Sequence, residues 1–311
     1  MKSIRIGIVG LGKIARDQHI PAIGASADFV LTAVASPYDR LPGVASFPSL
    51  ETMLDAQPEL DAVAICTPPQ AHYDGARLAL RRGLHVLVEK PPCSTVAQVE
   101  HLRALAASLG RTLFATWHSR YAPAVATAAG LLRTRTLRRA HVSWKEDVRQ
   151  WHPGQAWLRE AGGLGVFDAA INALSILTRL IPDPIFARSA RLHVPANWTT
   201  PIAAEAEFES ASGAIISASL DFRHPGSPQW DIDLGTDEGV LRLTGGGAGL
   251  AVEGHWVTDP HPSLSSEYAA IYGEFAELIS RGESDVDAGP LQCVADIQLV
   301  AQHVPAAPFE Y

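Results

Sequence analysis

The sequence predicts an α/β protein in which a doubly wound parallel sheet is followed by an α+β domain with an open, mostly antiparallel sheet. Up to about residue 118, short apolar runs alternate with longer amphipathic stretches, whereas short strands separated by turn residues dominate after about residue 119. The length of 311 residues is enough for about two domains at roughly 150 residues each. We therefore expect a first domain at residues 1–119 and a second at residues 120–311.

The strands expected in the first domain are apolar on both faces, as in parallel sheets that helices cover on both sides. They are the runs at residues 4–9 (IRIGIV), 29–36 (FVLTAVAS), 61–67 (DAVAICT), 85–90 (HVLVEK) and 112–117 (TLFATW). Segments with the 3.6-residue apolar spacing of helices lie between these runs, at residues 49–56, 71–82 and 95–109. Gly83 and Gly110 follow the last two segments, and glycine commonly ends a helix.

The second domain is expected to begin with a helix at residues 122–133, a strand at 138–148 and a glycine-led helix at 162–180. Four runs with strand alternation follow, at residues 204–210, 213–222, 230–236 and 239–245. The turn sequences SASG, HPGSP and TDEG separate them, so the pattern predicts an antiparallel meander. Two further helices are expected at residues 266–281 and 290–303.

Composition and charge exclude several classes of protein. A content of 47% hydrophobic and 19% charged residues is typical of a compactly folded chain, and the net charge of −8 disfavours nucleic acid as a partner. The sequence has no uncharged apolar run of about 18 residues, so neither a membrane span nor an export signal is expected. The cysteines and histidines form no metal-ligand spacing, so we expect no metal, and a reducing cytoplasm fits the three unpatterned cysteines.

A glycine motif directly follows the first expected strand and predicts a dinucleotide site. The segment reads Gly10-Leu11-Gly12-Lys13-Ile14-Ala15 and leads into a helical stretch within the βαβ pattern. The glycines allow a tight turn and close approach of a pyrophosphate, while the helix N-terminus offers unpaired N–H donors. We therefore expect NADP or NAD as cofactor, with Gly10, Gly12, Lys13 and Ile14 among its contacts.

Ser36 occupies the position, about 20 residues beyond the motif, where an acid usually binds the adenosine ribose. Serine carries no negative charge that would repel a ribose 2′-phosphate, so the site should admit NADP as well as NAD. Arg40 could supply a positive partner despite the adjacent Asp39, and Lys13 or Arg16 are weaker candidates. Alternatively, Ser36 only begins a turn.

Two further motifs follow strands that end at the same edge of the predicted sheet, where the cofactor should lie. Thr67 and Pro68 follow one strand, and are expected at the cofactor, although they also suit a rigid strand-ending turn. Glu89 and Lys90 end another strand, so Glu89 is expected at the cofactor and Lys90 near the nicotinamide. A lysine ammonium at that place can stabilise an alkoxide.

Together with the segment Gly-Gly-x-Gly-x-x-Asp at residues 162–168, these motifs resemble the Gfo/Idh/MocA family (glucose-fructose oxidoreductase and inositol dehydrogenase) over essentially the whole chain. The resemblance implies a Rossmann domain, a catalytic Lys90 and a later helix with an Asp and a His four residues apart. This chain has Asp168 and Asn172 at those places. Asparagine cannot exchange a proton near pH 7, which leaves Asp168 as the proton acceptor and Asn172 to orient the substrate.

Two alternatives to this assignment stay open. The spacing places Asp168 and Asn172 on one helical face, and a nearby Lys90 would favour the ionised carboxylate. Neutral Lys90 could instead be the base, with Asp168 only orienting it. In a purely structural alternative, Asp168 caps the helix and Asn172 makes a polar interior contact.

Two longer segments, residues 144–158 and 162–176, resemble a subgroup of the family more closely, the bacterial aldose 1-dehydrogenases that oxidise L-arabinose or D-galactose. The resemblance implies oxidation at C1 to an aldonolactone. The two sugars share the hydroxyl configuration at C2, C3 and C4, so one pocket could accept both. The shorter segments that add to the match are QHIPAI (18–23), VEKPPC (88–93), TPIAAE (200–205) and ESDVD (283–287).

Hydrogen-bonding groups and flat apolar faces that suit a pyranose occur in the same region. They are Glu146, Asp147, Trp151, His152 and Trp230, of which Glu146, His152 and Trp230 are the expected substrate contacts. His118 and Arg120 follow the last strand of the first domain and are expected to reach the same cleft. Each of these residues alone is more often structural, because tryptophans usually pack in cores and charged strand ends are usually solvated.

The sequence therefore predicts a cytoplasmic NAD(P)-dependent aldose 1-dehydrogenase with a substrate-binding and oligomerisation domain at residues 120–311. An open sheet face often pairs between subunits, so a homo-oligomer is expected. Two other functions remain open: an inositol or polyol dehydrogenase of the same fold, and a regulatory protein that binds NAD(P) without turnover.

Overall fold

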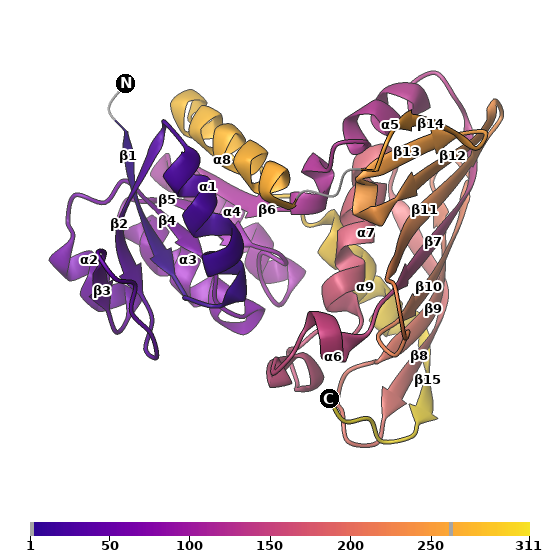
Figure 1. The fold of residues 1–311 in the computed structure, drawn as a ribbon, viewed down its shortest axis with the longest axis horizontal. Coiled ribbons are helices and arrows are strands. Elements are labelled where there is room, and N and C mark those ends of the chain that lie inside the picture. The colour runs from indigo at the N-terminus through magenta and orange to yellow at the C-terminus, as the bar shows by residue number, and fades with distance from the viewer. Residues whose placement is uncertain (1–2, 261–263) are drawn as a thin grey trace. The chain divides into compact units, whose positions relative to one another are not determined.

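The computed structural model describes residues 3–260 and 264–311, which fold into two compact units (Figure 1). The first unit comprises residues 3–118 and 264–288, and the second comprises residues 119–260 and 289–311. Among the helices of these described residues, none combines the length and the apolar character needed to cross a membrane.

The assignment of residues 264–288 to the second domain is wrong, because this segment packs with the first unit. Its helix α8 (Leu264–Arg281) buries an aromatic face, and Phe275 stacks on Phe29 with ring centroids 5.6 Å apart. In Figure 1 the orange α8 lies beside the indigo α1 (Ile20–Ala25). The amphipathic pattern of α8 predicts a buried face but not which unit buries it.

The first unit contains a six-stranded, fully parallel sheet in the order β3-β2-β1-β4-β5-β6. The strands are β1 (Ile4–Val9), β2 (Phe29–Ala35), β3 (Ala45–Phe47), β4 (Ala62–Ile65), β5 (His85–Glu89) and β6 (Leu113–Thr116). This confirms the predicted parallel sheet, to which the structure adds the three-residue β3. The strand order reverses at β1, so the carboxyl ends of β1 and β4 flank the place where ligands bind in such sheets.

Two helices of this unit, α2 (Leu50–Ala56) and α4 (Val96–Leu109), begin with a side-chain cap. Ser49 and Thr52 form a capping box at the start of α2, Thr95 caps α4, and Gly110 ends α4 in the left-handed conformation. The helical segments are η1 (Ala15–His19), α2 (Leu50–Ala56), η2 (Pro69–Ala71), α3 (His72–Arg81), α4 (Val96–Leu109) and η3 (His118–Tyr121), which runs into the second unit.

The second unit contains a nine-stranded, mostly antiparallel sheet in the order β14-β13-β12-β11-β7-β10-β9-β8-β15. Its strands are β7 (Leu137–Lys145), β8 (Ile185–Pro195), β9 (Ala203–Ser210), β10 (Ile215–Asp221), β11 (Gln229–Thr236), β12 (Gly239–Thr244), β13 (Gly249–Val252), β14 (His255–Thr258) and β15 (Ala301–Ala306). The helical segments are α5 (Val125–Leu132), α6 (Val148–Trp151), η4 (Ala156–Arg159), α7 (Phe167–Leu180), η5 (Gly245–Gly247) and α9 (Gly289–Val300). In Figure 1, α5, α7 and α9 lie against one face of the sheet, and among the described residues no helix covers the other. This confirms the open, mostly antiparallel sheet.

The predicted meander is interrupted, because β7 lies between β10 and β11. β7 pairs parallel with β10 and antiparallel with β11, and its alternate residues Ala140, Val142 and Trp144 are buried. A turn sequence between two strands does not reveal whether they pair directly or admit another strand between them. The predicted last helix is also shorter, since α9 ends at Val300 and the chain continues as β15.

Candidate functional site

The glycine turn after β1 has the shape that a dinucleotide requires. Gly10 has a φ of +95°, and a Cβ there would lie 2.9 Å from the carbonyl group of Cys66 at the end of β4. At Gly12, no described atom would lie within 4 Å of a Cβ, so this side of the turn faces open space. Ile14 leads into η1, and Lys13 pairs with Asp17 on the surface. The turn thus fits close approach of a pyrophosphate.

A cavity of about 550 Å³ opens at the carboxyl ends of β1 and β4, within the first unit. The buried Oγ1 of Thr67 has no hydrogen-bond partner among the described residues, as expected of a group that meets a polar ligand. Most of the lining could not be predicted from the sequence, because its residues follow ordinary amphipathic helix patterns. The lining residues are Val9, Leu50, Glu51, Ile65, Thr67, Ala71, Asp74, Gly75, Arg77 and Leu78.

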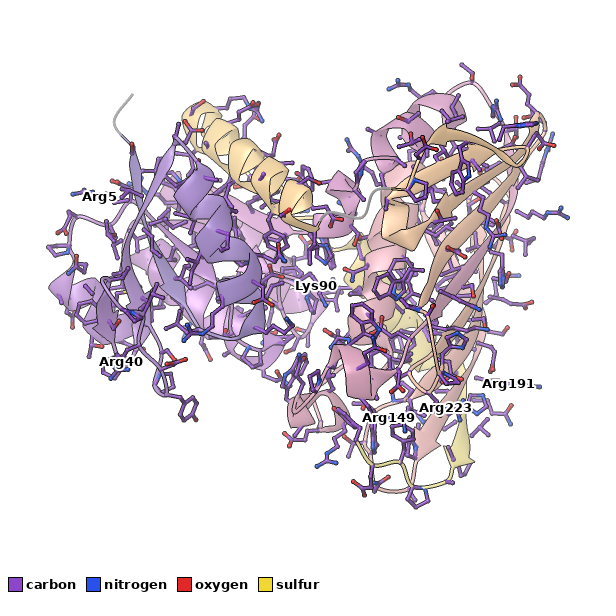
Figure 2. The ribbon with its side chains drawn as sticks, viewed as in Figure 1. Arg5, Arg40, Lys90, Arg149, Arg191 and Arg223 are labelled. Carbon is purple, nitrogen blue, oxygen red and sulfur yellow. The ribbon has the colours of Figure 1, made fainter. Side chains whose placement is uncertain are left out.

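Ser36 lies directly after β2 and is buried. Its N–H donates to the carbonyl of Phe47 (2.9 Å), and Arg40, labelled in Figure 2, donates from Nη1 to the carbonyl oxygen of Ser36 (2.9 Å). Arg16 pairs instead with Asp39, and hydrogen bonds from Arg40 N–H and from Arg16 lower the pKa of Asp39. Arg40 is therefore the cation that the fold holds beside Ser36.

Lys90 follows β5 and is labelled in Figure 2; its peptide bond to Pro91 is cis. The preceding Glu89 is predicted to contact the cofactor, but in the structure its carboxylate is buried and accepts hydrogen bonds from the protein itself. Oε1 accepts hydrogen bonds from Tyr268 (2.6 Å) and His19 (2.9 Å), and Oε2 accepts one from the backbone N–H of Lys90 (3.0 Å). Burial opposes ionisation, yet the hydrogen bond and charge of His19 outweigh it and lower the pKa of Glu89 to about 2.

Pro68 is the N-cap of the 3₁₀ turn η2, which follows β4, and the neighbouring Thr67 is held by a buried histidine. His72 lies within hydrogen-bond distance of two carbonyl oxygens, that of Thr67 (2.6 Å) from Nε2 and that of Pro91 (2.9 Å) from Nδ1. One side chain therefore connects the segments that follow β4 and β5. The role of His72 could not be predicted from the sequence, since a lone histidine in a helix carries no distinguishing pattern.

In the second unit, three of the predicted substrate residues meet around one carboxylate. Glu146 follows β7, and its side chain is buried. Oε1 of Glu146 lies 2.8 Å from His152 Nε2, and Oε2 accepts a hydrogen bond from Trp230 Nε1 (2.7 Å). Trp230 of β11 pairs with Trp144 of β7. Because Trp144 lies two residues before Glu146, this pairing brings the Trp230 indole to the Glu146 carboxylate.

Asp168 stands at the start of α7 and approaches the same histidine from the other side. Its Oδ2 lies 4.0 Å from His152 Nδ1, so a carboxylate flanks each nitrogen of the imidazole ring. Asp168 lies in the first turn of α7, where the helix dipole interacts favourably with a negative charge. One turn later, the buried Oδ1 of Asn172 has no hydrogen-bond partner among the described residues.

The glycines before α7 allow the close backbone contacts that place Asp168. Gly165 has a φ of +55°, and a Cβ there would collide with the carbonyl oxygen of Pro201. A Cβ on Gly163 would collide with the carbonyl oxygens of Trp157 and Leu158. The segment Gly-Gly-x-Gly therefore fixes the entry to α7.

The remaining predicted residues have other surroundings. His118 Nδ1 lies 2.7 Å from Glu267 Oε2 of α8, within the first unit, whereas Arg120 donates to Ser175 and Thr178 near the end of α7. Asp147 caps α6, and hydrogen bonds from Arg149, labelled in Figure 2, lower the pKa of Asp147. Trp151 meets Trp230 edge to face with centroids 5.0 Å apart. Within residues 3–260 and 264–311, no group of three or more His, Cys, Asp or Glu residues could hold a metal ion.

Comparisons with known proteins agree with this fold. A family model for an oxidoreductase family with an NAD-binding Rossmann fold matches residues 4–116. Galactose 1-dehydrogenase of Pseudomonas fluorescens is 46% identical over 311 residues, which covers 99% of this chain and 99% of that protein. The dTDP-3,4-didehydro-2,6-dideoxy-alpha-D-glucose 3-reductase of Streptomyces antibioticus is 33% identical over 256 residues, 77% of this chain and 75% of that one.

Solved structures give the same result. The crystal structure of a D-galactose-1-dehydrogenase protein from Rhizobium etli superimposes with a TM-score of 0.94 at 46% identity, covering 100% of this chain and 99% of that chain. A 3-ketoreductase from Actinomadura kijaniata, solved with NADP and TDP-benzene, has a TM-score of 0.85 at 19% identity over 98% of this chain and 100% of that chain, and thus shares the fold.

Proposed function

Because the chain belongs to the Gfo/Idh/MocA family of NAD-binding oxidoreductases, we propose that it is an NAD(P)-dependent aldose 1-dehydrogenase that oxidises D-galactose, L-arabinose or both. One observation carries the substrate class. The 46% identity to galactose 1-dehydrogenase extends over the whole chain, and so over the unit that holds Glu146, His152, Asp168 and Trp230. Carboxylates, imidazole and an indole face are groups that suit a pyranose.

The residues of the first unit that would hold the cofactor fit a dinucleotide. Gly10, Gly12, Lys13 and Ile14 would bind the pyrophosphate, and the region of Ser36 and Arg40 would take the adenosine ribose. Thr67 and Pro68 would line the bound cofactor at the sheet edge, with the hydroxyl of Thr67 as a hydrogen-bonding group. When bound, the nicotinamide accepts the hydride that C1 of the sugar releases.

In the proposed reaction, Asp168 removes the proton of the anomeric hydroxyl as C1 loses its hydrogen with the bonding electron pair. The C1–O single bond becomes a carbonyl double bond, and the product is an aldonolactone. Lys90 stabilises the negative charge that develops on the oxygen. Asn172 orients the sugar through its unpartnered Oδ1.

In the second unit, Glu146, His152 and Trp230 would have different roles in binding the sugar. Both carboxylate oxygens of Glu146 are engaged, so we assign Glu146 to holding His152 and Trp230 rather than to direct contact with the substrate. His152 lies between Glu146 and Asp168, where its ring can hydrogen-bond a sugar hydroxyl or Asp168. Trp230 would present an apolar face to the C–H groups of the ring.

An aldose panel tests this proposal. We expect the absorbance of reduced nicotinamide to rise with D-galactose and L-arabinose, with the lactone as first product. Turnover of myo-inositol but of neither aldose would favour a polyol dehydrogenase. Binding of NAD(P) without turnover of any of these compounds would favour a regulatory protein.

A second prediction concerns the choice of cofactor. We expect turnover with NADP, and Ser36→Asp should raise KM for NADP by roughly tenfold or more, with a much smaller effect on NAD, because like charges would meet at the 2′-phosphate. Steady-state kinetics with both cofactors measures this, and Ser108→Asp, on the exposed face of α4, is the matched control. Equal effects of Ser36→Asp on the two cofactors would remove Ser36 from the adenosine site.

We also propose that the protein forms a homo-oligomer and that it is cytoplasmic. The helix-free face of the nine-stranded sheet carries charges of both signs, for example Arg242 beside Asp231 (3.0 Å), and a second copy could cover it in a homo-oligomer. The three cysteines are buried and form no disulfide, which suits a cytoplasmic protein.

A further inference from the structure

The first unit buries a carboxylate that the proposed reaction does not use. Glu89 is 5% exposed, and its immediate partners His19 and Tyr268 are fully buried. Tyr272 is hydrogen-bonded to His19. We name these four residues, Glu89, His19, Tyr268 and Tyr272, the Glu89 cluster. Its members come from β5, η1 and α8, segments far apart in the sequence.

The hydrogen bonds of the Glu89 cluster are mutually consistent. Tyr268 donates to Glu89 Oε1 (2.6 Å), and His19 donates from Nε2 to the same oxygen (2.9 Å). On the other side of the ring, His19 Nδ1 lies 2.8 Å from the hydroxyl of Tyr272, which can either donate or accept a hydrogen bond. Each polar side chain of the cluster therefore has a hydrogen-bond partner within the cluster.

The second oxygen of Glu89 connects the cluster to Lys90. Oε2 accepts the backbone N–H of Lys90 (3.0 Å), so the cluster ties the main chain at Lys90 to η1 and α8. η1 itself follows the glycine turn, since its first residue is Ala15. The Glu89 cluster thus fixes the lysine relative to the segment that begins the cofactor site.

Stability alone does not explain a buried ion at this place. Taking a carboxylate out of water costs free energy, and apolar residues of similar volume often stabilise a core equally well. Glu89 is nevertheless held ionised, with a pKa of about 2. The other titratable or charged groups that face the cluster are Cys66, His72, Lys90, His118 and Glu267.

We propose that Glu89 is a positioning residue for Lys90, and that His19, Tyr268 and Tyr272 hold Glu89 in the required orientation. The inference rests on the proposed function only for the role of Lys90. Glu89→Gln is the sharp test, because an amide has one accepting end while both carboxylate oxygens of Glu89 face donors. Tyr268→Phe removes a single hydroxyl and provides a second variant if Glu89→Gln does not fold.

The first experiment is a double-mutant cycle on kcat. Glu89→Gln should lower kcat by roughly 10- to 100-fold with a small change in KM, since a misplacement of about 1 Å can cost 10²-fold. If Glu89 acts through Lys90, the same substitution should have no further effect in a Lys90→Ala background. Effects that multiply in the double variant would overturn the proposal.

The second experiment needs no activity. The chain has four lysines, Lys2, Lys13, Lys90 and Lys145, so reductive ¹³C-methylation should give few, separately assignable NMR signals. The signal of Lys90 should move in Glu89→Gln and in Tyr268→Phe, while that of Lys145, on the second unit, should not. Tyr73→Phe is the matched control, because it removes a surface hydroxyl bonded to His101.

The two experiments separate the possible failures. A Lys90 signal that stays in place in both variants overturns the positioning role, whichever sugar is oxidised. A Lys90 signal that moves, in a protein that turns over no aldose, supports the positioning role and contradicts the proposed function.

Discussion

Lys90→Ala should lower kcat by about 10²- to 10³-fold, the loss found when one preorganised donor is removed from a developing oxyanion. The proposed reaction places negative charge on the C1 oxygen only as the O–H and C–H bonds break. An ammonium aimed at that oxygen therefore acts mainly in the transition state, and the loss should fall on kcat rather than on KM.

A measurement of cofactor binding distinguishes a direct loss of kcat in Lys90→Ala from damage to the fold. Lys90 is not among the residues that line the cavity beside Thr67, so the Kd for NADP should change little in Lys90→Ala. Arg103→Ala, which removes an exposed cation from α4, is the control and should keep full activity. A Lys90→Ala enzyme with nearly normal kcat would exclude the lysine from the reaction.

Asp168→Asn should also lower kcat strongly, by roughly 10²-fold or more, because it keeps the shape of the side chain and removes the proton acceptor. The wild-type pH profile of kcat should rise with the ionisation of one group and then flatten. That rise should vanish in Asp168→Asn. Asp237→Asn, in an exposed turn of the same unit where the carboxylate accepts from Thr136, is the matched control.

The pH profile of Asp168→Asn also decides between the two candidate bases. If neutral Lys90 is the base and Asp168 only orients it, kcat should fall only slightly and the acid limb should survive unchanged. That outcome would assign the base to Lys90. If Asp168→Asn loses the acid limb of the pH profile and its kcat also falls strongly, the base is Asp168.

The sequence predicts the local elements of this fold well, because each depends on nearby residues. The strands of the first sheet are apolar on both faces, and Gly10 marks the turn that a pyrophosphate needs. The stretch from Glu146 to His152 also folds locally, so its pairing could be expected from the sequence. Trp230 was selected for its chemistry, but only the pairing of β11 with β7 explains its bond to Glu146.

The features that could not be predicted depend on distant segments. Glu89 is the last residue of a strand that ends at the cofactor edge, so its position suggests a cofactor contact. Its hydrogen bond to Tyr268 instead joins residues 179 apart in the sequence, and no local pattern indicates it. Helix α8 also supplies Glu267, whose carboxylate lies 2.7 Å from His118 Nδ1. This helix belongs to the first unit, although it follows most of the second-unit strands in the sequence. The insertion of β7 between β10 and β11 is likewise set by strand pairing rather than by turn residues.

The transfer of hydrogen from C1 of an aldose can be followed with C1-deuterated D-galactose or L-arabinose and oxidised cofactor. Mass spectrometry of the reduced nicotinamide should then show one deuterium per molecule, and the sugar product should be the lactone without the label. Reduced cofactor that carries no deuterium, or a product oxidised at a ring carbon other than C1, would contradict oxidation at C1.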